Sequence, residues 1–129
     1  MPSMRLDAVS VTSGDLARSA KFYTLLGFRF PDFKADTQHL EPMTAEGEVR
    51  LMIDDKTLMK SIIGKEPTPS NHSSFAIKCT SPAEVDGVVA RIRGAGFAVV
   101  KEPWDAFWGQ RYAIVADPDG YMVDLFAPL

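Results

Sequence analysis

The sequence has few of the residues that build disulfides and metal sites. Its 129 residues include one cysteine, Cys79, and two histidines, His39 and His72. A single cysteine cannot form a disulfide within the chain, which favours a reducing, cytoplasmic location. No apolar run approaches the roughly 20 residues of a membrane-spanning helix, and the chain does not start like a signal peptide. We therefore expect a cytoplasmic protein without a membrane partner.

The chain also lacks an excess of positive charge. Fourteen Lys and Arg residues against 17 Asp and Glu residues give a net charge of −3, and no Lys/Arg cluster is present. This balance argues against a nucleic-acid partner. Apolar residues make up 46% and charged residues 24% of the chain. Both values are ordinary for globular proteins and exclude disorder. The length predicts a single domain, 1–129.

The same order of elements occurs twice along the chain. Alternating residues predict a strand at 5–12, and Asp15 is a good N-cap for a helix that Gly27 ends. Further strands are predicted at 28–30, 37–43 and 48–54. The second round is expected as a strand at 73–79, a helix from the Ser81–Glu84 capping box, and strands at 97–100, 111–116 and 121–126.

The spacing of corresponding residues supports a duplication. The pairs are Asp15 with Ser81, Gly27 with Gly96, and Gly47 with Gly120, at offsets of 66, 69 and 73. The offset changes only at turns and helix ends, as in a diverged repeat. We therefore predict an α+β fold of two modules, 1–64 and 72–129, which a Pro-rich linker at 65–71 joins.

Two segments resemble signatures of a known family. Residues 15–28 (Asp-Leu-Ala-Arg-Ser-Ala-Lys-Phe-Tyr, then Leu-Gly-Phe) resemble the first helix of the vicinal oxygen chelate superfamily, which includes glyoxalase I, bleomycin-resistance proteins and extradiol dioxygenases. Residues 107–112 and the turn 117–120 resemble its C-terminal signature. The resemblance implies two βαβββ modules with curved mixed sheets around a cavity, helices on the outer face, and a homodimer.

The resemblance also implies a metal site, of which this sequence retains little. Relatives use His or Glu from the first and last strands of each module. The corresponding residues here are Ala8, Leu51, Ser74 and Asp124. Because a stable site needs at least three protein ligands, we expect no metal and no other cofactor. The alternative is a metal-dependent lyase or dioxygenase with a rearranged site made of His39, His72 and Asp124.

Alternation along the last two strands predicts which side chains face the cavity. A four-residue turn at 117–120 would pair Ala116 with Tyr121. This register puts Arg111 and Asp124 on the cavity face and Tyr112 on the face that packs on the helix. An Arg111–Asp124 ion pair could then simply fix the hairpin. From the other strands, the cavity face is expected to carry Ala8, Ser10, Thr12, Leu51, Ile53, Ser74 and Ala76.

Both tryptophans lie in one segment, 103–112. Two indoles and a phenylalanine at the cavity rim suit stacking against a flat or cationic ligand, although they could instead brace a loop or a dimer interface. We predict an aromatic-rimmed, apolar pocket for a small organic ligand, and we leave open whether any catalysis is retained. A dimeric module with a filled cavity is a third possibility. The candidate ligand-binding residues are His39, Leu51, Ser74, Trp104, Phe107, Trp108, Arg111 and Asp124.

Overall fold

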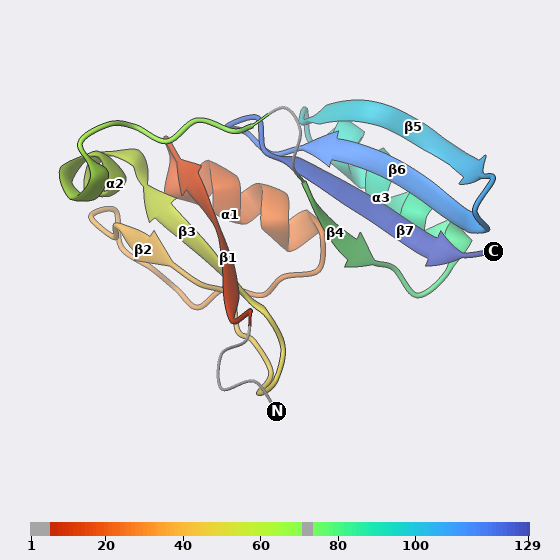
Figure 1. Cartoon of the computed structure of the whole chain (residues 1–129), viewed down its shortest axis with the longest axis horizontal. Helices are drawn as coiled ribbons and strands as arrows, with labels where there is room; N and C mark the ends of the chain where they lie inside the picture. The colour runs from red at the N-terminus through yellow and green to blue at the C-terminus, as the bar shows by residue number, and fades with distance from the viewer. Residues whose placement is uncertain (1–5, 71–73) are drawn as a thin grey trace. The chain divides into compact units, whose positions relative to one another are not determined.

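The computed structural model of the chain describes residues 6–70 and 74–129. The chain divides into two compact units, Met1–Thr68 and Pro69–Leu129. The first unit contains β1 (Ala8–Ser13), α1 (Leu16–Leu25), β2 (His39–Leu40), β3 (Arg50–Asp55) and α2 (Lys56–Ile63). The second contains β4 (Phe75–Lys78), α3 (Pro82–Gly94), β5 (Ala98–Ala106), β6 (Gln110–Ala116) and β7 (Met122–Pro128), which Figure 1 shows in chain order. None of the described helices is long and apolar enough to cross a membrane.

The first unit is built on a mixed sheet of order β1-β3-β2. β1 runs parallel to β3, and β2 is antiparallel to it. The parallel register sets Val9 against Leu51 and Val11 against Ile53. Paired residues of neighbouring strands point to the same face of a sheet. These four side chains therefore form one apolar face, which α1 covers. Leu51 and Ile53 are buried there, so their expected position beside Ala8 and Ser10 is wrong.

The opposite face of this sheet is polar. Ala8 pairs with Arg50, Ser10 with Met52, and Thr12 with Asp54. The alternation rule itself holds along each strand. The two strands lie one residue out of step with the expected alignment, and a shift of one residue moves every side chain to the other face.

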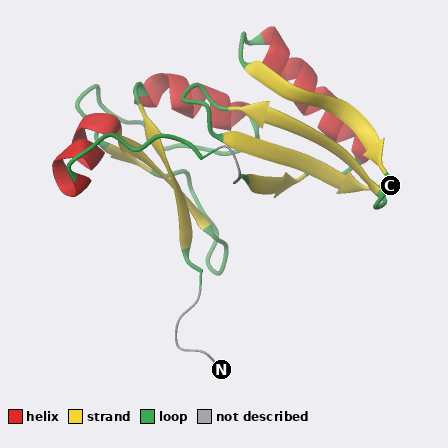
Figure 2. Ribbon diagram, turned by 45° about the horizontal axis from the view of Figure 1, so that its top comes forward, coloured by secondary structure: helices red, strands yellow, loops and turns green. Residues whose placement is uncertain are grey.

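The second unit is a mixed sheet of order β4-β7-β6-β5, in which only the β4–β7 pair is parallel. α3 lies along one face of β5, β6 and β7 (Figure 2). The buried residues between helix and sheet are Val85, Val88, Val89 and Ile92 of α3 with Ala113, Val115, Val123, Leu125 and Ala127 of the strands. The two mixed sheets and their helices confirm the predicted α+β class.

The turn between β6 and β7 has five residues, not the expected four. Ala116 pairs with Met122, and the Asp117 carboxylate accepts hydrogen bonds from the backbone N–H groups of Asp119 and Tyr121, both at 2.9 Å. The extra residue reverses the faces of β6 relative to β7. Tyr112 therefore shares the face of Asp124, and the expected placement of Arg111 on that face is wrong.

Local signals predicted the helices better than the short strands. The N-caps are confirmed: the Asp15 side chain accepts from the N–H of Arg18 at 3.2 Å, and that of Ser81 from the N–H of Glu84 at 3.1 Å. Residues 28–30 form no strand, β2 has only two residues, and α2 follows β3 directly, where no helix was expected.

Candidate functional site

Four aromatic side chains gather on the face of the second sheet opposite α3. The register aligns Trp104 of β5 with Tyr112 of β6, and Tyr112 with Phe126 of β7. Their ring centroids are 5.5 Å and 6.2 Å apart. Trp108, in the turn between β5 and β6, places its ring 6.0 Å from that of Trp104 and 5.4 Å from that of Tyr112. We call these four residues the aromatic cluster.

The cluster is closely packed, and Trp108 remains accessible. Trp108 packs at 90° to Trp104 and at 79° to Tyr112, which are favourable edge-to-face arrangements. Its indole N–H donates to the side-chain oxygen of Gln110 at 2.9 Å. Gly109 adopts φ +90°, a conformation that permits the tight turn. Trp108 is 49% exposed, so its ring offers contact area to a ligand.

A carboxylate lies beside the cluster. Asp124 of β7 is half-buried on the same face, and the Tyr112 hydroxyl donates to its Oδ2. Burial and this hydrogen bond to an acidic group together raise the pKa of Tyr112 to about 12. The phenol therefore remains protonated and acts as a hydrogen-bond donor at neutral pH.

Asp124 has no cationic partner within the described part of the chain. Arg111, the expected partner, points to the other face, where it donates to Asp86 at 3.0 Å and to Asp105 at 3.2 Å. Lys101 of β5 pairs with Ile114 of β6, which pairs with Asp124 of β7, so Lys101 lies two strands from the carboxylate. Its ammonium sits 5.1 Å from the centroid of the Trp104 ring. The predicted Arg111–Asp124 pair is therefore wrong, and a phenol stands where a cation was expected.

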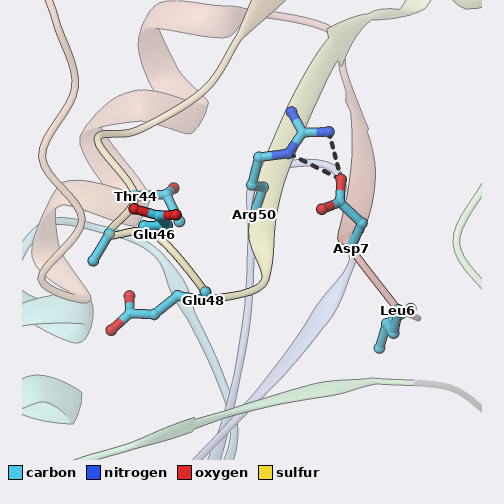
Figure 3. Close-up of a pocket in the computed structure, with 8 residues that line it drawn as sticks. Leu6, Asp7, Thr44, Glu46, Glu48 and Arg50 are labelled. Atoms are coloured by element: carbon cyan, nitrogen blue, oxygen red, sulfur yellow. Dashed lines mark hydrogen bonds and ion pairs between the residues drawn. The ribbon is translucent and has the colours of Figure 1, made fainter. Parts of the chain in front are cut away.

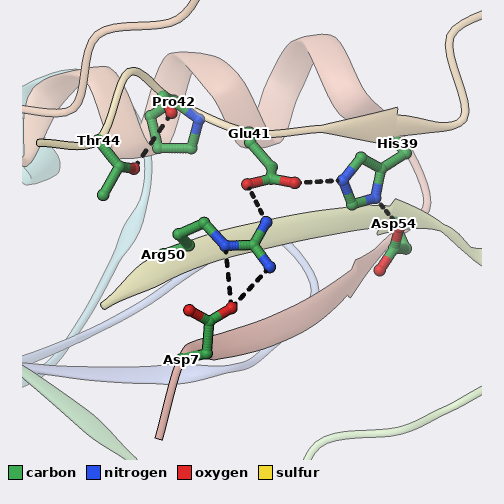
Figure 4. A network of polar contacts seen from close by, with 7 residues as sticks. All are labelled: Asp7, His39, Glu41, Pro42, Thr44, Arg50 and Asp54. Carbon is green, nitrogen blue, oxygen red and sulfur yellow. Dashed lines mark hydrogen bonds and ion pairs between the residues drawn. The ribbon is translucent and has the colours of Figure 1, made fainter. Parts of the chain in front are cut away.

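The polar face of the first sheet carries a chain of charged side chains (Figure 4). His39 Nδ1 lies 2.5 Å from Asp54 Oδ1, and its Nε2 lies 2.7 Å from Glu41 Oε2. The Arg50 guanidinium extends the chain, because it forms ion pairs with Glu41 at 2.7 Å and with Asp7 at 2.9 Å. Hydrogen bonds to Glu41 and Asp54 raise the pKa of His39, so the imidazolium form is favoured.

A shallow hollow of about 210 Å³ adjoins this network (Figure 3). Asp7, Glu46, Glu48 and Arg50 are its charged lining residues, and the Arg50–Asp7 ion pair forms part of its wall. It contains no aromatic side chain and none of the residues predicted from the sequence.

The structure brings together only some of the predicted site residues. Trp104, Trp108 and Asp124 lie on one face, and Ser74 precedes β4, whose Ala76 pairs with Asp124. Phe107, at the tip of the turn, is 97% exposed, and its ring centroid lies 5.2 Å from that of Trp108. Leu51 lies in the core of the first unit, His39 lies in the polar network, and Arg111 faces α3. His72 lies outside the described residues.

Sequence reasoning placed Tyr112 on the wrong face of the sheet and did not name Phe126 among the site residues. A signal for Tyr112 was present, because an Asp at the start of the turn can accept hydrogen bonds from the backbone farther along. A five-residue turn would have placed Tyr112 beside Asp124. Phe126 lies two residues after Asp124, so alternation along β7 places both side chains on one face.

The residues at the superfamily's metal positions do not fit a metal ion. Asp124 pairs with Ala76. The residue that corresponds to Ala76 in the first unit lies 66 positions earlier and is Ser10, which pairs with Met52. Met52, not Leu51, is thus the counterpart of Asp124. The donor set of a carboxylate, a hydroxyl, a methyl group and a thioether lacks the three strong ligands that a divalent ion needs. Among the described residues, no three His, Cys, Asp or Glu side chains are placed to hold a metal.

Comparison with known proteins identifies the family. The model of the glyoxalase/bleomycin resistance protein/dioxygenase superfamily matches residues 5–125. The chain belongs to this superfamily, which confirms the resemblance found in the sequence. A search of curated proteins found no match.

Several solved structures share the fold. A hypothetical protein from S. aureus is 24% identical, with 98% of this chain and 95% of that one covered and a TM-score of 0.76. A glyoxalase-related enzyme from Fulvimarina pelagi is 19% identical, with 95% and 87% covered and a TM-score of 0.80. Lactoylglutathione lyase from Agrobacterium tumefaciens is 18% identical, with 98% and 95% covered and a TM-score of 0.69. At these identities the likeness establishes the fold alone.

Proposed function

We propose that this chain is a small-molecule-binding protein of the glyoxalase and bleomycin-resistance type that holds an organic ligand without a catalytic metal. The observation that carries the proposal is the aromatic cluster on the sheet face opposite α3, with the half-buried carboxylate of Asp124 beside it. Apolar, rigid ring surface with a small number of polar groups is typical of ligand sites.

The energetics favour a flat ligand. Removing about 150 Å² of apolar surface from water contributes about 4 kcal/mol. The loss of translational and rotational freedom on association offsets much of this gain. Ring contacts therefore favour a planar group, and stable binding requires a polar anchor in addition.

The metal-enzyme alternative requires at least three strong metal ligands, which the residues at the superfamily's metal positions do not provide. Of the residues named for a rearranged site, Asp124 lies in the second unit, and both ring nitrogens of His39 are already within hydrogen-bonding distance of carboxylates in the first. No observation favours a catalytic centre built on these two side chains.

The test uses the two tryptophans as reporters, because both lie in the cluster. A spectrum of the ¹⁵N-labelled full chain gives one indole N–H signal for each. We expect titration with a neutral planar compound, 1-naphthalenemethanol, to shift both signals in a saturable manner. Trp108→Ala should weaken binding about tenfold, whereas the matched removal of an exposed ring in the first unit, Phe33→Ala, should not change it.

The proposal fails if planar compounds of every charge leave both indole signals unchanged up to their solubility limits. It also fails if Phe33→Ala weakens binding as much as Trp108→Ala does.

A further inference from the structure

We infer that the ligand of this face carries a positive charge, as a protonated amine or another organic cation, and that Asp124 is its counter-ion. The inference rests on the proposed function and concerns the chemical class of the ligand. It follows from the charges on this face and from the orientation of Arg111.

The first step is the charge balance around Asp124. The side chain is half-buried, and the Tyr112 hydroxyl supplies its one hydrogen bond from the described residues. The phenol donates a hydrogen bond but carries no positive charge, so it does not balance the charge of the carboxylate. A partly desolvated carboxylate without a cation is costly, and a ligand cation would remove that cost.

The second step concerns the lysines that could replace such a ligand. Lys78 of β4 pairs with Phe126, which makes it a diagonal neighbour of Asp124, yet its side chain is exposed and forms no ion pair with it. Lys101 is directed to Trp104. The basic side chains described on this face therefore leave Asp124 unpaired.

The third step is that the aromatic cluster itself favours cations. The quadrupole of an aromatic ring gives its face a partial negative charge, which attracts ammonium groups within about 6 Å. The Lys101 ammonium, 5.1 Å from the Trp104 centroid, is an example within the chain. Rings and carboxylate thus select the same sign of charge, and a planar or compact organic cation satisfies both.

The experiment compares three probes of nearly the same shape on the full chain: 1-naphthylmethylamine, 1-naphthalenemethanol and 1-naphthoate. We expect the amine to bind at least tenfold more tightly than the alcohol, and naphthoate to bind more weakly than either. Asp124→Asn should reduce the affinity for the amine to that for the alcohol. Asp105→Asn is the control: it removes one negative charge from β5, on the opposite face of the same sheet, and should preserve the preference for the amine over the alcohol.

A measurement on the unaltered chain protects the test against a variant that does not fold. Raising the salt concentration from 0.05 M to 0.5 M should weaken binding of the amine severalfold and leave the alcohol almost unaffected, because salt screens a partly exposed ion pair. Equal affinity for amine and alcohol would overturn the inference and leave the proposed function standing. Tightest binding of naphthoate would also overturn it, in favour of the lysines. No response to any probe would refute the proposed function, and this inference with it.

Discussion

The hydrogen bond from Tyr112 to Asp124 provides the sharpest test of the second sheet, because it exists only with the five-residue turn. Tyr112→Phe removes the hydroxyl and keeps the ring, so contacts with Trp104, Trp108 and Phe126 are preserved. Hydrogen bonds to charged groups contribute about 1.5–3 kcal/mol. Since both side chains are only half-buried, we expect a loss near the lower limit, about 1–2 kcal/mol.

The assay is urea denaturation of the wild type, Tyr112→Phe, Asp124→Ala and the double variant. The two residues are in contact, so their effects should not add, and the coupling free energy should be about 1 kcal/mol. In the alternative register, with Arg111 facing Asp124, Tyr112 would point toward α3. A coupling below about 0.3 kcal/mol, the usual limit of additivity for independent sites, would refute the pairing of Ala116 with Met122 and the five-residue turn.

The same bond has a dependence on pH with a definite sign. Burial and the bond to Asp124 raise the pKa of Tyr112 to about 12, above its ordinary value of 10.0. The protonated phenol is therefore favoured in the folded chain. Its contribution to the free energy of unfolding is complete below pH 10 and is lost as the pH rises from about 10 to about 12. An absorbance titration should show a tyrosine ionising near pH 12, and Tyr112→Phe should remove that step.

Three further predictions concern other parts of the molecule. Hydrogen bonds to Glu41 and Asp54 raise the pKa of His39 above 6.5, so its contribution is complete below pH 6.5 and is lost as the pH rises through the raised value. His39→Gln should remove this dependence, at a cost of about 0.5–1 kcal/mol at pH 6 by denaturation, and an equal dependence in the variant would contradict it. Burial raises the pKa of the Cys79 thiol, so a thiol reagent should react with it much more slowly in the folded chain than in urea, and equal rates would refute its burial. We also propose the homodimer that the family resemblance implies, and light scattering should give twice the 14.2 kDa of one chain, whereas a mass of 14.2 kDa would exclude it.

The helices that the sequence predicted correctly have signals within a few residues of one another. Asp15 and Ser81 cap helices through side-chain bonds to residues three positions ahead. α2 was missed although Asp55 caps it with its side chain, accepting from the N–H of Thr57 at 2.9 Å and from that of Leu58 at 3.4 Å. The preceding strand ends at this Asp, so the cap is concealed within a pattern that also fits the end of a strand.

The site was harder to predict because it depends on pairing between strands. Each strand's own alternation was recognised, but which faces coincide depends on the register. In the first unit the register of β1 against β3 moved Leu51 to the core and Met52 to the polar face. No pattern within one strand determines its alignment with another, so errors of one residue are expected wherever both faces contain apolar residues.

The single extra residue in the 117–121 turn determines the chemistry of the candidate site. With a four-residue turn, Arg111 would neutralise Asp124, and the face would offer a ligand an internally satisfied ion pair beside two indoles. With five residues, Arg111 is engaged by Asp86 and Asp105, and the phenol of Tyr112 takes its place beside Asp124. The same residues in the same strands then present an unneutralised carboxylate among ring faces. Because both features favour positive charge, the selectivity proposed for this face follows from a turn whose length the carboxylate of Asp117 stabilises.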